Sequence, residues 1–353
     1  MAAALLSVPA PVSAVSAEDP HIPEEAGGRL YVASQAAAAV SILDMDSHEV
    51  LETIWLTELG FTPDAKPHHI AVEPDGSAWY VSLIGDNKVL KFDRDNRLVG
   101  QVEFERPGML AVHPTRDLLF VGRSMAAVNP PQRIGIIRRS DMAIEELDVF
   151  FPRPHAIVVH PDGDHLYTAS LAENRLASLE IESEELELSG LGEGPPAVLV
   201  QFAVSPDGQT LVGTGQLTSK LLVFDLADPM APSRTHSIDV NAAPWHPAFS
   251  PDGRYVYFGN QNANTVTVVE TDGWTVDAVI EGEGLAEPHG VATSSDGRYL
   301  YVSNRNQKGA YSSVGNADEH PGTVVVIDTS SREIIDVIEV APYAAGMSAS
   351  SPK

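Results

Sequence analysis

One phrase recurs along this chain of 353 residues and constrains its fold more than any other feature. Its first copy reads Pro67-His-His-Ile-Ala-Val-Glu-Pro-Asp-Gly76, and the second proline or its equivalent marks the later copies. The marker positions are 74, 114, 161, 206, 251 and 295, so the steps are 40, 47, 45, 45 and 44 residues. A repeat of this length is typical of the blades of a β-propeller.

Each repeat contains the sequence signals of four short strands. The first strand ends in Pro-Asp-Gly, where proline presets φ and glycine takes the positive φ of a hairpin turn. A strand rich in tyrosine and valine follows, such as Tyr255-Val-Tyr-Phe258. A turn with asparagine leads to a third strand ending in aspartate, such as Val324-Val-Val-Ile-Asp328, and then to a fourth such as Glu333-Ile-Ile-Asp-Val-Ile338. Four antiparallel strands of this length make one blade.

The two ends of the chain predict how the ring closes. Arg29-Leu-Tyr-Val-Ala-Ser34 is a second-strand phrase without a first strand before it, and Pro342–Ser348 is a first-strand phrase without a blade after it. Together they make a seventh blade, and closure removes exposed sheet edges. We therefore predict an all-β fold in which residues 29–353 form one seven-bladed β-propeller closed by the C-terminal strand. A signal-like or disordered segment at 1–28 precedes it. A solenoid or separate sandwiches would not explain the complementary ends.

Several phrases resemble those of the YVTN-repeat propeller family. They are Tyr-Val-Ser-Asn at 301–304, Asn-Thr-Val-Thr-Val-Val at 264–269 and the recurring Pro-His-x-Val-Ala-x-Ser-Pro-Asp-Gly. The resemblance covers residues 29–350 and implies the propeller fold. Because that family includes binding proteins, surface-layer proteins and enzymes, the resemblance leaves the function open.

The composition excludes several kinds of site. The chain has no cysteine, so disulfides, thiolate nucleophiles, iron–sulfur clusters and cysteine-ligated zinc are absent. It has 22 basic and 49 acidic residues and a formal net charge of −27, which repels nucleic-acid phosphates. Neither a glycine-rich phosphate loop nor a haem motif is present, so we expect no nucleotide, no haem and no nucleic-acid partner.

The first residues indicate export. Ala2–Val8 is apolar, and Val15-Ser16-Ala17 resembles a signal-peptidase site, although no basic residue precedes the apolar run. A disordered tail of alanine, proline and serine is the alternative. No other apolar run approaches the ~20 residues that span a bilayer. We expect a periplasmic or secreted protein without a membrane span.

Five of the 12 histidines occupy equivalent positions where the first strands begin. These strand entries meet around one mouth of a propeller's central channel. The position after the first proline holds His68, Gly108, His155, Val200, Trp245, His289 and Tyr343, and the next holds His69, Met109, Ala156, Gln201, His246, Gly290 and Ala344. We therefore predict that His68, His69, His155, His246 and His289 converge at this mouth. The alternative is that each histidine only bonds the neighbouring blade.

Five imidazoles without a competing thiolate favour a transition metal, copper before zinc. A bound cation would keep the crowded rings neutral, whereas protonated rings would repel one another. Met109 or Gln201 is a candidate for a weak extra ligand, with Tyr343 nearby. A metal-free structural role remains the other interpretation.

The His-His pair followed by single histidines resembles the propeller domain of nitrous oxide reductase, which holds a multinuclear copper centre. The resemblance implies paired ligands at His68 and His69 and single ligands at His155, His246 and His289. Other residues, Gly108 and Val200 among them, stand where further histidines would be expected, and no cysteine-rich electron-entry domain is present. A mononuclear or dinuclear site therefore remains open.

Two long loops are predicted on the same face, Ser124–Gln132 and Asn304–Gly322. Long loops on a rigid scaffold usually carry recognition, so we expect a small-molecule ligand or a protein partner there. The candidate rim or substrate residues are Met109, Arg123, Gln201, Trp245, Arg305, His320 and Tyr343. His113 and His160 precede hairpin prolines, and we expect them to pack the turns.

The sequence thus predicts an exported binding propeller with a histidine-lined, copper-competent mouth. A metal-dependent oxidoreductase, which would need an external electron-transfer partner, is the first alternative. A metal-free scaffold or protein-interaction module is the second. Metal-free lactonase or lyase chemistry lacks an identified acid–base pair.

Overall fold

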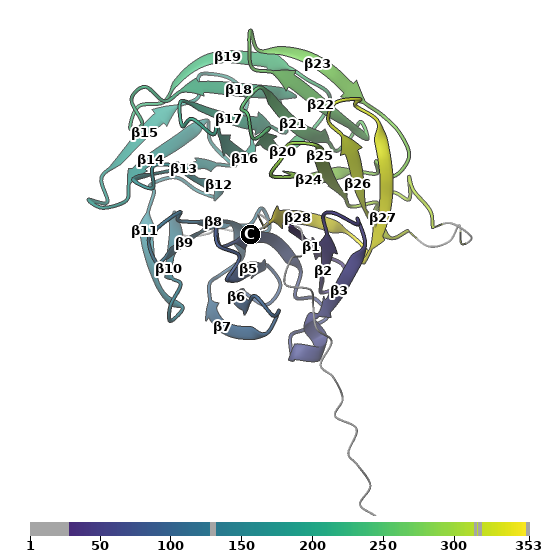
Figure 1. Ribbon diagram of the computed structural model, residues 1–353. Coiled ribbons are helices and arrows are strands. Elements are labelled where there is room, and N and C mark those ends of the chain that lie inside the picture. The colour runs from purple at the N-terminus through teal and green to yellow at the C-terminus, as the bar shows by residue number, and fades with distance from the viewer. Residues whose placement is uncertain (1–27, 128–131, 314–315, 317–319, 351–353) are drawn as a thin grey trace, which may run out of the picture.

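The computed structural model describes residues 28–127, 132–313, 316 and 320–350. Within these ranges the chain forms seven four-stranded antiparallel sheets arranged as a ring (Figure 1), which confirms the predicted seven-bladed propeller. The signal-like segment and the middle of each long loop lie outside the described residues.

The strands fall into four concentric sets. The innermost strands are β28 (Ala344–Ala349), β4 (Pro67–Val72), β8 (Pro107–Val112), β12 (Pro154–Val159), β16 (Leu199–Val204), β20 (Pro244–Phe249) and β24 (Pro288–Thr293). The second strands are β1 (Arg29–Ser34), β5 (Ala78–Leu83), β9 (Leu118–Arg123), β13 (His165–Ser170), β17 (Thr210–Gly215), β21 (Tyr255–Asn260) and β25 (Tyr299–Asn304). The third strands are β2 (Ala39–Asp44), β6 (Lys88–Asp93), β10 (Arg133–Arg138), β14 (Arg175–Glu180), β18 (Lys220–Asp225), β22 (Thr265–Glu270) and β26 (Gly322–Asp328). The outermost strands are β3 (Val50–Trp55), β7 (Leu98–Glu103), β11 (Ala143–Asp148), β15 (Leu186–Gly190), β19 (Ser233–Asp239), β23 (Thr275–Ile280) and β27 (Ile334–Val340). A 3₁₀ turn, η1 (Leu56–Leu59), follows β3.

The ring is closed by strands from both ends of the chain. The first sheet has the order β28-β1-β2-β3, and β28 pairs antiparallel with β1 through Val32↔Met347 and Leu30↔Ala349. The Ser350 N–H donates to the Arg29 carbonyl at 2.8 Å, which extends the pairing by one residue. This arrangement confirms closure by the C-terminal strand and leaves the first blade without an open inner edge.

Burial along the strands follows their place in a blade. β5 is buried throughout because neighbouring blades cover both of its faces, whereas outermost β7 alternates half-buried and exposed residues. Aromatic rings pack within and between blades. Trp79 stacks on Phe92 of the neighbouring strand with centroids 4.1 Å apart, and Tyr31 of the first blade lies 5.1 Å from Trp79. The core is therefore a set of layers between blades.

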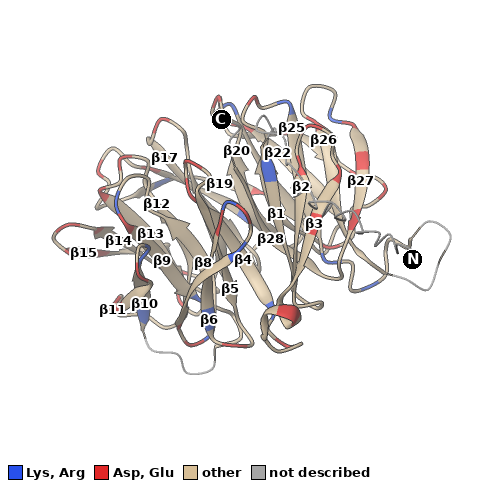
Figure 2. Ribbon diagram, turned by 60° about the horizontal axis from the view of Figure 1, so that its bottom comes forward, with Lys and Arg blue, Asp and Glu red and all other residues tan. Residues whose placement is uncertain are grey.

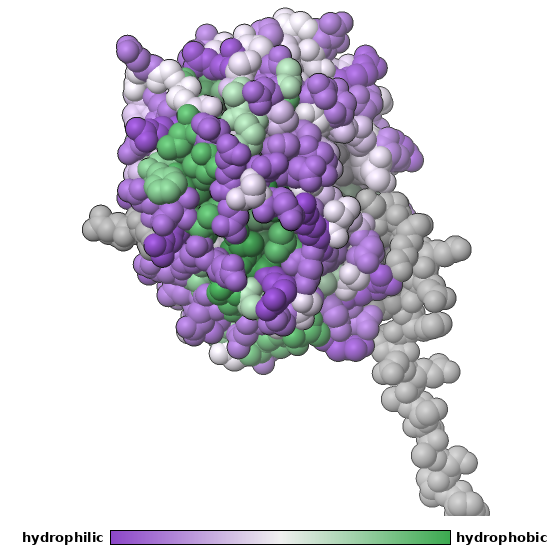
Figure 3. All heavy atoms as spheres, turned by 90° about the vertical axis from the view of Figure 1, so that its left-hand side faces the viewer, coloured by the Kyte–Doolittle hydropathy of each residue, from purple (hydrophilic) through white to green (hydrophobic). Residues whose placement is uncertain are grey.

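The outer surface is hydrophilic with apolar residues interspersed. Figure 2 shows acidic residues in many of the turns and outer strands, in keeping with the net charge of −27. The side of the ring formed by β11, β14 and β15 carries a broken hydrophobic band among hydrophilic residues (Figure 3). Among the described residues, no helix has the length and apolar character needed to cross a membrane.

Candidate functional site

Every innermost strand begins with the same backbone turn. The residue before each of these strands has a left-handed conformation, with φ between 48° and 65°, although none of the seven is glycine; they are Lys66, Arg106, Arg153, Val198, Ala243, Glu287 and Tyr343. Each of their carbonyls accepts a hydrogen bond, 2.7–3.2 Å long, from the N–H that follows the second strand of the same blade. A left-handed residue costs about 1–2 kcal/mol, so its sevenfold repetition shows that this entry requires it.

This turn corrects the sequence alignment in the first blade. Tyr343 is the left-handed residue itself, and Ala344 pairs with Ser34 as Pro67 pairs with Leu83. The two positions after the strand's first residue are therefore Ala345 and Gly346, not Tyr343 and Ala344. The error arose because β28 begins without the proline that marks most other inner strands. A following proline disfavours right-handed helical φ and ψ in the residue before it, but the sequence does not reveal the left-handed choice.

The structure brings the five mouth histidines together as one buried cluster. His68, His69, His155, His246 and His289 are between 1% and 9% exposed. His68 lies 5.8 Å from His155 and 5.8 Å from His289, measured between ring centroids. His289 lies 4.7 Å from His246, which in turn lies 5.9 Å from His69. The five rings thus form a continuous chain of neighbours, which we call the mouth cluster.

Sterics explain why some equivalent positions hold no histidine. A Cβ atom on Gly108 would stand 2.7 Å from the Arg123 carbonyl oxygen and 3.0 Å from His155 Nδ1. A Cβ atom on Gly346 would stand 2.5 Å from the His68 carbonyl oxygen. These glycines make room for the histidines of neighbouring blades.

Hydrogen bonds assign the tautomers of two cluster residues. His155 donates its Nδ1–H to the Arg123 carbonyl at 2.7 Å, which leaves its Nε2 with a free lone pair. His69 Nδ1 instead accepts from the Leu110 N–H at 3.1 Å, so the proton of the neutral ring is on Nε2. His155 can therefore offer a nitrogen to a metal through Nε2, whereas His69 presents a donor.

The other three rings have buried nitrogens without hydrogen bonds. Both ring nitrogens of His68, Nε2 of His246 and Nδ1 of His289 are buried and have no partner in the described part of the chain. Leaving such an atom unpaired costs about 1–3 kcal/mol. Four buried ring nitrogens of the mouth cluster therefore lack a hydrogen-bond partner among the described residues.

Burial keeps the whole cluster neutral. It lowers the pKa of His69 to about 3 and the pKa of His155 to about 4. Burial also takes the pKa values of His68, His246 and His289 well below 6.5, and the neighbouring imidazoles lower them further. Neutral imidazole is the form that ligates metals.

Three predicted rim residues lie beside the cluster. The Trp245 ring lies 5.0 Å from the His289 ring, and its buried Nε1–H has no acceptor in the described structure. The Arg305 guanidinium lies over the Tyr343 ring, 4.4 Å from its centroid. Its charge contributes to the lowered pKa values of His68 and His289. An aromatic ring and a cation thus adjoin the histidines.

The other candidate rim residues pack in the core or bond to groups outside the mouth cluster. Met109 is fully buried in an apolar cluster with Phe120 and Phe151, so it packs between blades. Arg123 is buried and bonds the Glu105 and Arg133 carbonyls and Glu146.

Gln201 accepts two backbone N–H bonds through Oε1, from Ile157 and Phe202. His320 is exposed, with Nδ1 at 3.4 Å from the Tyr311 carbonyl. Neither contact places these side chains in the mouth cluster.

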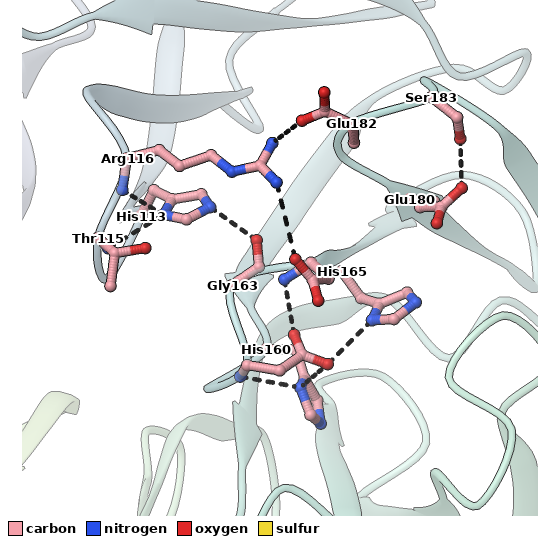
Figure 4. A network of polar contacts seen from close by, with 11 residues as sticks. His113, Thr115, Arg116, His160, Gly163, His165, Glu180, Glu182 and Ser183 are labelled. Carbon is pink, nitrogen blue, oxygen red and sulfur yellow. Dashed lines mark hydrogen bonds and ion pairs between the residues drawn. The ribbon is translucent and has the colours of Figure 1, made fainter.

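Two further histidines at the opposite ends of the inner strands have a structural role. His113 and His160 each bond a turn glycine of the next blade through Nε2. His113 bonds Gly163 at 2.6 Å (Figure 4), and His160 bonds Gly208 at 2.7 Å. Their Nδ1 atoms accept N–H groups of their own turns. The expectation that they pack the hairpins is confirmed.

His160 also belongs to a group of potential metal ligands. His160, Asp162 and His165 are, in the described ranges, the one group of three such residues with ligand atoms within 4.8 Å of one another. Because the Asp162 N–H already occupies the lone pair of His160 Nδ1, this group is explained by the turn. No three nitrogens of the mouth cluster meet the same distance limit.

Comparisons with known proteins agree on the fold. Residues 200–332 match the sequence model of the lactonase family with a seven-bladed β-propeller. No match is found among curated proteins. Among solved structures, hydrazine synthase of Kuenenia stuttgartiensis is similar, with a TM-score of 0.63 and 20% identity over 78% of this chain and 87% of that chain.

Two other solved structures cover more of this chain. A candidate 6-phosphogluconolactonase from Bacteroides fragilis has a TM-score of 0.69 and 14% identity over 94% of this chain and 99% of its own. The dihydro-heme d1 dehydrogenase NirN has a TM-score of 0.64 and 15% identity over 93% and 76%. At these identities the likeness concerns the fold. The chain is therefore similar in fold to these proteins, and its residues 200–332 are similar to the lactonase family with a seven-bladed β-propeller.

Proposed function

We propose that this protein binds a transition-metal ion, copper in preference to zinc, at the mouth cluster. The ligands are drawn from His68, His155, His246 and His289. The observation that carries the proposal is the set of buried, unpartnered nitrogens on His68, His246 and His289. Imidazole nitrogen suits copper, which stands above zinc in the affinity order of divalent ions.

The spacing of neighbouring rings is compatible with coordination of one ion by two of them, although no three nitrogens of the cluster lie within 4.8 Å of one another in the described structure. With metal–nitrogen bonds of about 2 Å, imidazoles on one ion place their ring centroids roughly 4.5–6 Å apart. The distances of 4.7 Å for His246–His289 and 5.8 Å for both His68–His289 and His68–His155 fall in that range. A half-turn of His68 about its Cβ–Cγ bond would exchange its nitrogen and carbon edges without breaking a hydrogen bond.

Two features prepare the cluster for a cation. The His155 Nδ1–H bond to the Arg123 carbonyl fixes the ring as metal-ligating histidines are commonly fixed. The lowered pKa values of the cluster mean that few protons compete with the ion at neutral pH. His69, with its proton on Nε2, lies outside this ligand set. Its Nε2–H is a hydrogen-bond donor for a ligand bound at the mouth.

The same pKa values favour metal binding over hydrolysis by these residues. A general base works best with a pKa near the operating pH, and burial holds the pKa values of all five histidines far below neutrality. Similarity to the lactonase family over 200–332 therefore supports the shared fold without supplying a base at this mouth.

The proposal is tested by calorimetric titration of metal-free, untagged protein with Cu²⁺ and Zn²⁺, together with elemental analysis. His289→Gln should weaken copper binding by more than about tenfold, because each lost ligand removes a metal–nitrogen bond. His236→Gln is the matched control, since His236 is exposed on outermost β19. Equal copper affinity in wild type and His289→Gln, or no uptake by wild type, would overturn the proposal.

A further inference from the structure

We infer that the mouth also binds a small anion of the carboxylate class, held by the guanidinium of Arg305 and the indole N–H of Trp245. The inference deepens the proposed metal site by naming what shares it. It starts from a guanidinium without a carboxylate partner and from two buried hydrogen-bond donors, Arg305 Nε–H and Trp245 Nε1–H, that have no acceptor in the described residues.

Arg305 supplies the charge. Its backbone N–H bonds the Glu287 carbonyl, so it stands where innermost β24 begins, and its guanidinium lies over the Tyr343 ring. One Nη2–H donates to the neutral Gln307 side chain at 2.7 Å, while its buried Nε–H has no acceptor in the described structure. A guanidinium with an unpaired Nε–H beside neutral rings is suited to a carboxylate.

The nearby carboxylate does not neutralise Arg305. Glu287 is buried, and its two oxygens face Lys308, one accepting the backbone N–H at 3.0 Å and the other lying 3.6 Å from Nζ. No carboxylate of the described residues forms an ion pair with Arg305 within 4.0 Å. Adding a metal cation to the neutral cluster would increase the positive charge, which a bound anion would offset.

The polar groups left open beside the cluster include two more donors. Trp245 is 4% exposed, and its Nε1–H can only donate. The tautomer of His69 places an Nε2–H on the same chain of rings, 5.9 Å from His246 between centroids. Arg305 and Trp245, which both lie near His289, supply donors for the lone pairs of a carboxylate.

The rim extends the positive potential. Arg106 and Arg153 hold the left-handed positions that open β8 and β12, and neither has a carboxylate partner in the described ranges. Arg106 donates to the Ile84 carbonyl at 3.1 Å, which leaves its charge uncompensated. In a chain with net charge −27, such a basic opening would guide anions to the channel.

The experiment uses azide as the probe anion. Azide binding to copper-loaded protein is followed by its charge-transfer absorption, and binding to metal-free protein by calorimetry. Arg305→Gln should weaken azide binding about tenfold, and Trp245→Phe, which keeps an aromatic ring, should weaken it severalfold. Arg298→Gln is the matched control, because Arg298 also lies over a tyrosine ring, Tyr299 at 5.0 Å, but in an exposed hairpin.

The outcomes separate this inference from the metal proposal. Copper content is measured in every sample, and its absence from wild type overturns the metal proposal; the variants are then compared in metal-free protein. Equal azide affinity in wild type and Arg305→Gln overturns the anion inference whatever the copper content. Weaker binding in Arg305→Gln with normal binding in Arg298→Gln supports it.

Discussion

The histidines at the two ends of the inner strands are equally buried but differ in their partners. His155 is the second residue of β12 and His160 directly follows its last residue, about 16 Å away at ~3.3 Å per residue. His160 bonds the Gly208 carbonyl through Nε2 and its own turn through Nδ1, as His113 does with Gly163. At the mouth, His68 bonds nothing through either nitrogen. Burial alone therefore does not distinguish the two sets, whereas buried ring nitrogens without a partner occur, among these histidines, only at His68, His246 and His289.

The hairpin histidines also determine the residues opposite them. A Cβ atom on Gly163 or Gly208 would stand 2.9 Å from the ring of His113 or His160. Both glycines have φ above 70°, as their turns require. The histidine ring and the glycine thus form a close contact between blades, and this contact occurs at His113–Gly163 and at His160–Gly208.

The largest expected effect is the response of the mouth cluster to acid. A histidine whose folded pKa lies below the unfolded value of ~6.5 binds its proton only when the protein unfolds, so its contribution to stability falls as the pH drops below ~6.5. For His69, with a pKa of about 3, and His155, with a pKa of about 4, the loss between pH 7.5 and pH 5 is about 2 kcal/mol each.

Denaturant unfolding of metal-free protein at several pH values measures this loss. The positive charge of Arg305, like burial, lowers the pKa values of His68 and His289 and so disfavours their protonation. His155→Gln should flatten the pH dependence. A wild-type stability that is constant from pH 7.5 to 5 would contradict the assignment of neutral, buried rings.

The next effect is structural. His113→Ala removes the 2.6 Å bond to Gly163 and leaves the Thr115 and Arg116 N–H groups without their acceptor. We expect the free energy of unfolding to fall by about 2–3 kcal/mol, with copper binding unchanged. Unfolding curves and a copper titration measure the two properties. Loss of copper binding in a folded His113→Ala protein would show that the hairpin histidines also affect the metal site, which would contradict the distinction between the two sets.

The smallest effect has the opposite sign. His68→Leu removes two buried nitrogens that have no partner and fills a similar volume with apolar atoms. The metal-free protein should be as stable as wild type or more stable by about 1 kcal/mol, although copper binding is weakened. A clear loss of stability in thermal unfolding would show that His68 has a structural role.

The sequence predicted the fold well because its repeats carry local signals. Pro-Asp-Gly turns and alternating strands identify blades, and the phrases at Arg29 and Pro342 predicted the pairing of β1 with β28. The positions of the mouth histidines followed from aligning the repeats. The two-residue error in the first blade arose because β28 begins at Ala344 and not at Pro342, so the marker proline is missing from its first position.

The properties that decide the site's chemistry were not readable from sequence. The tautomer of His69 depends on the Leu110 N–H, 41 residues away, and the packing of Met109 depends on side chains of the next blade. The position of Arg305 over Tyr343 joins the loop after β25 to the first blade. Such contacts between blades follow from closure of the ring, which local repeats do not specify.

The most direct test of the central claim is anomalous diffraction at the copper edge from crystals of copper-loaded, untagged protein. The account predicts an anomalous peak at the mouth cluster, about 2 Å from ring nitrogens of at least two of His68, His155, His246 and His289. A loaded crystal without a peak there, or with its only strong peak at His160, Asp162 and His165, would contradict it.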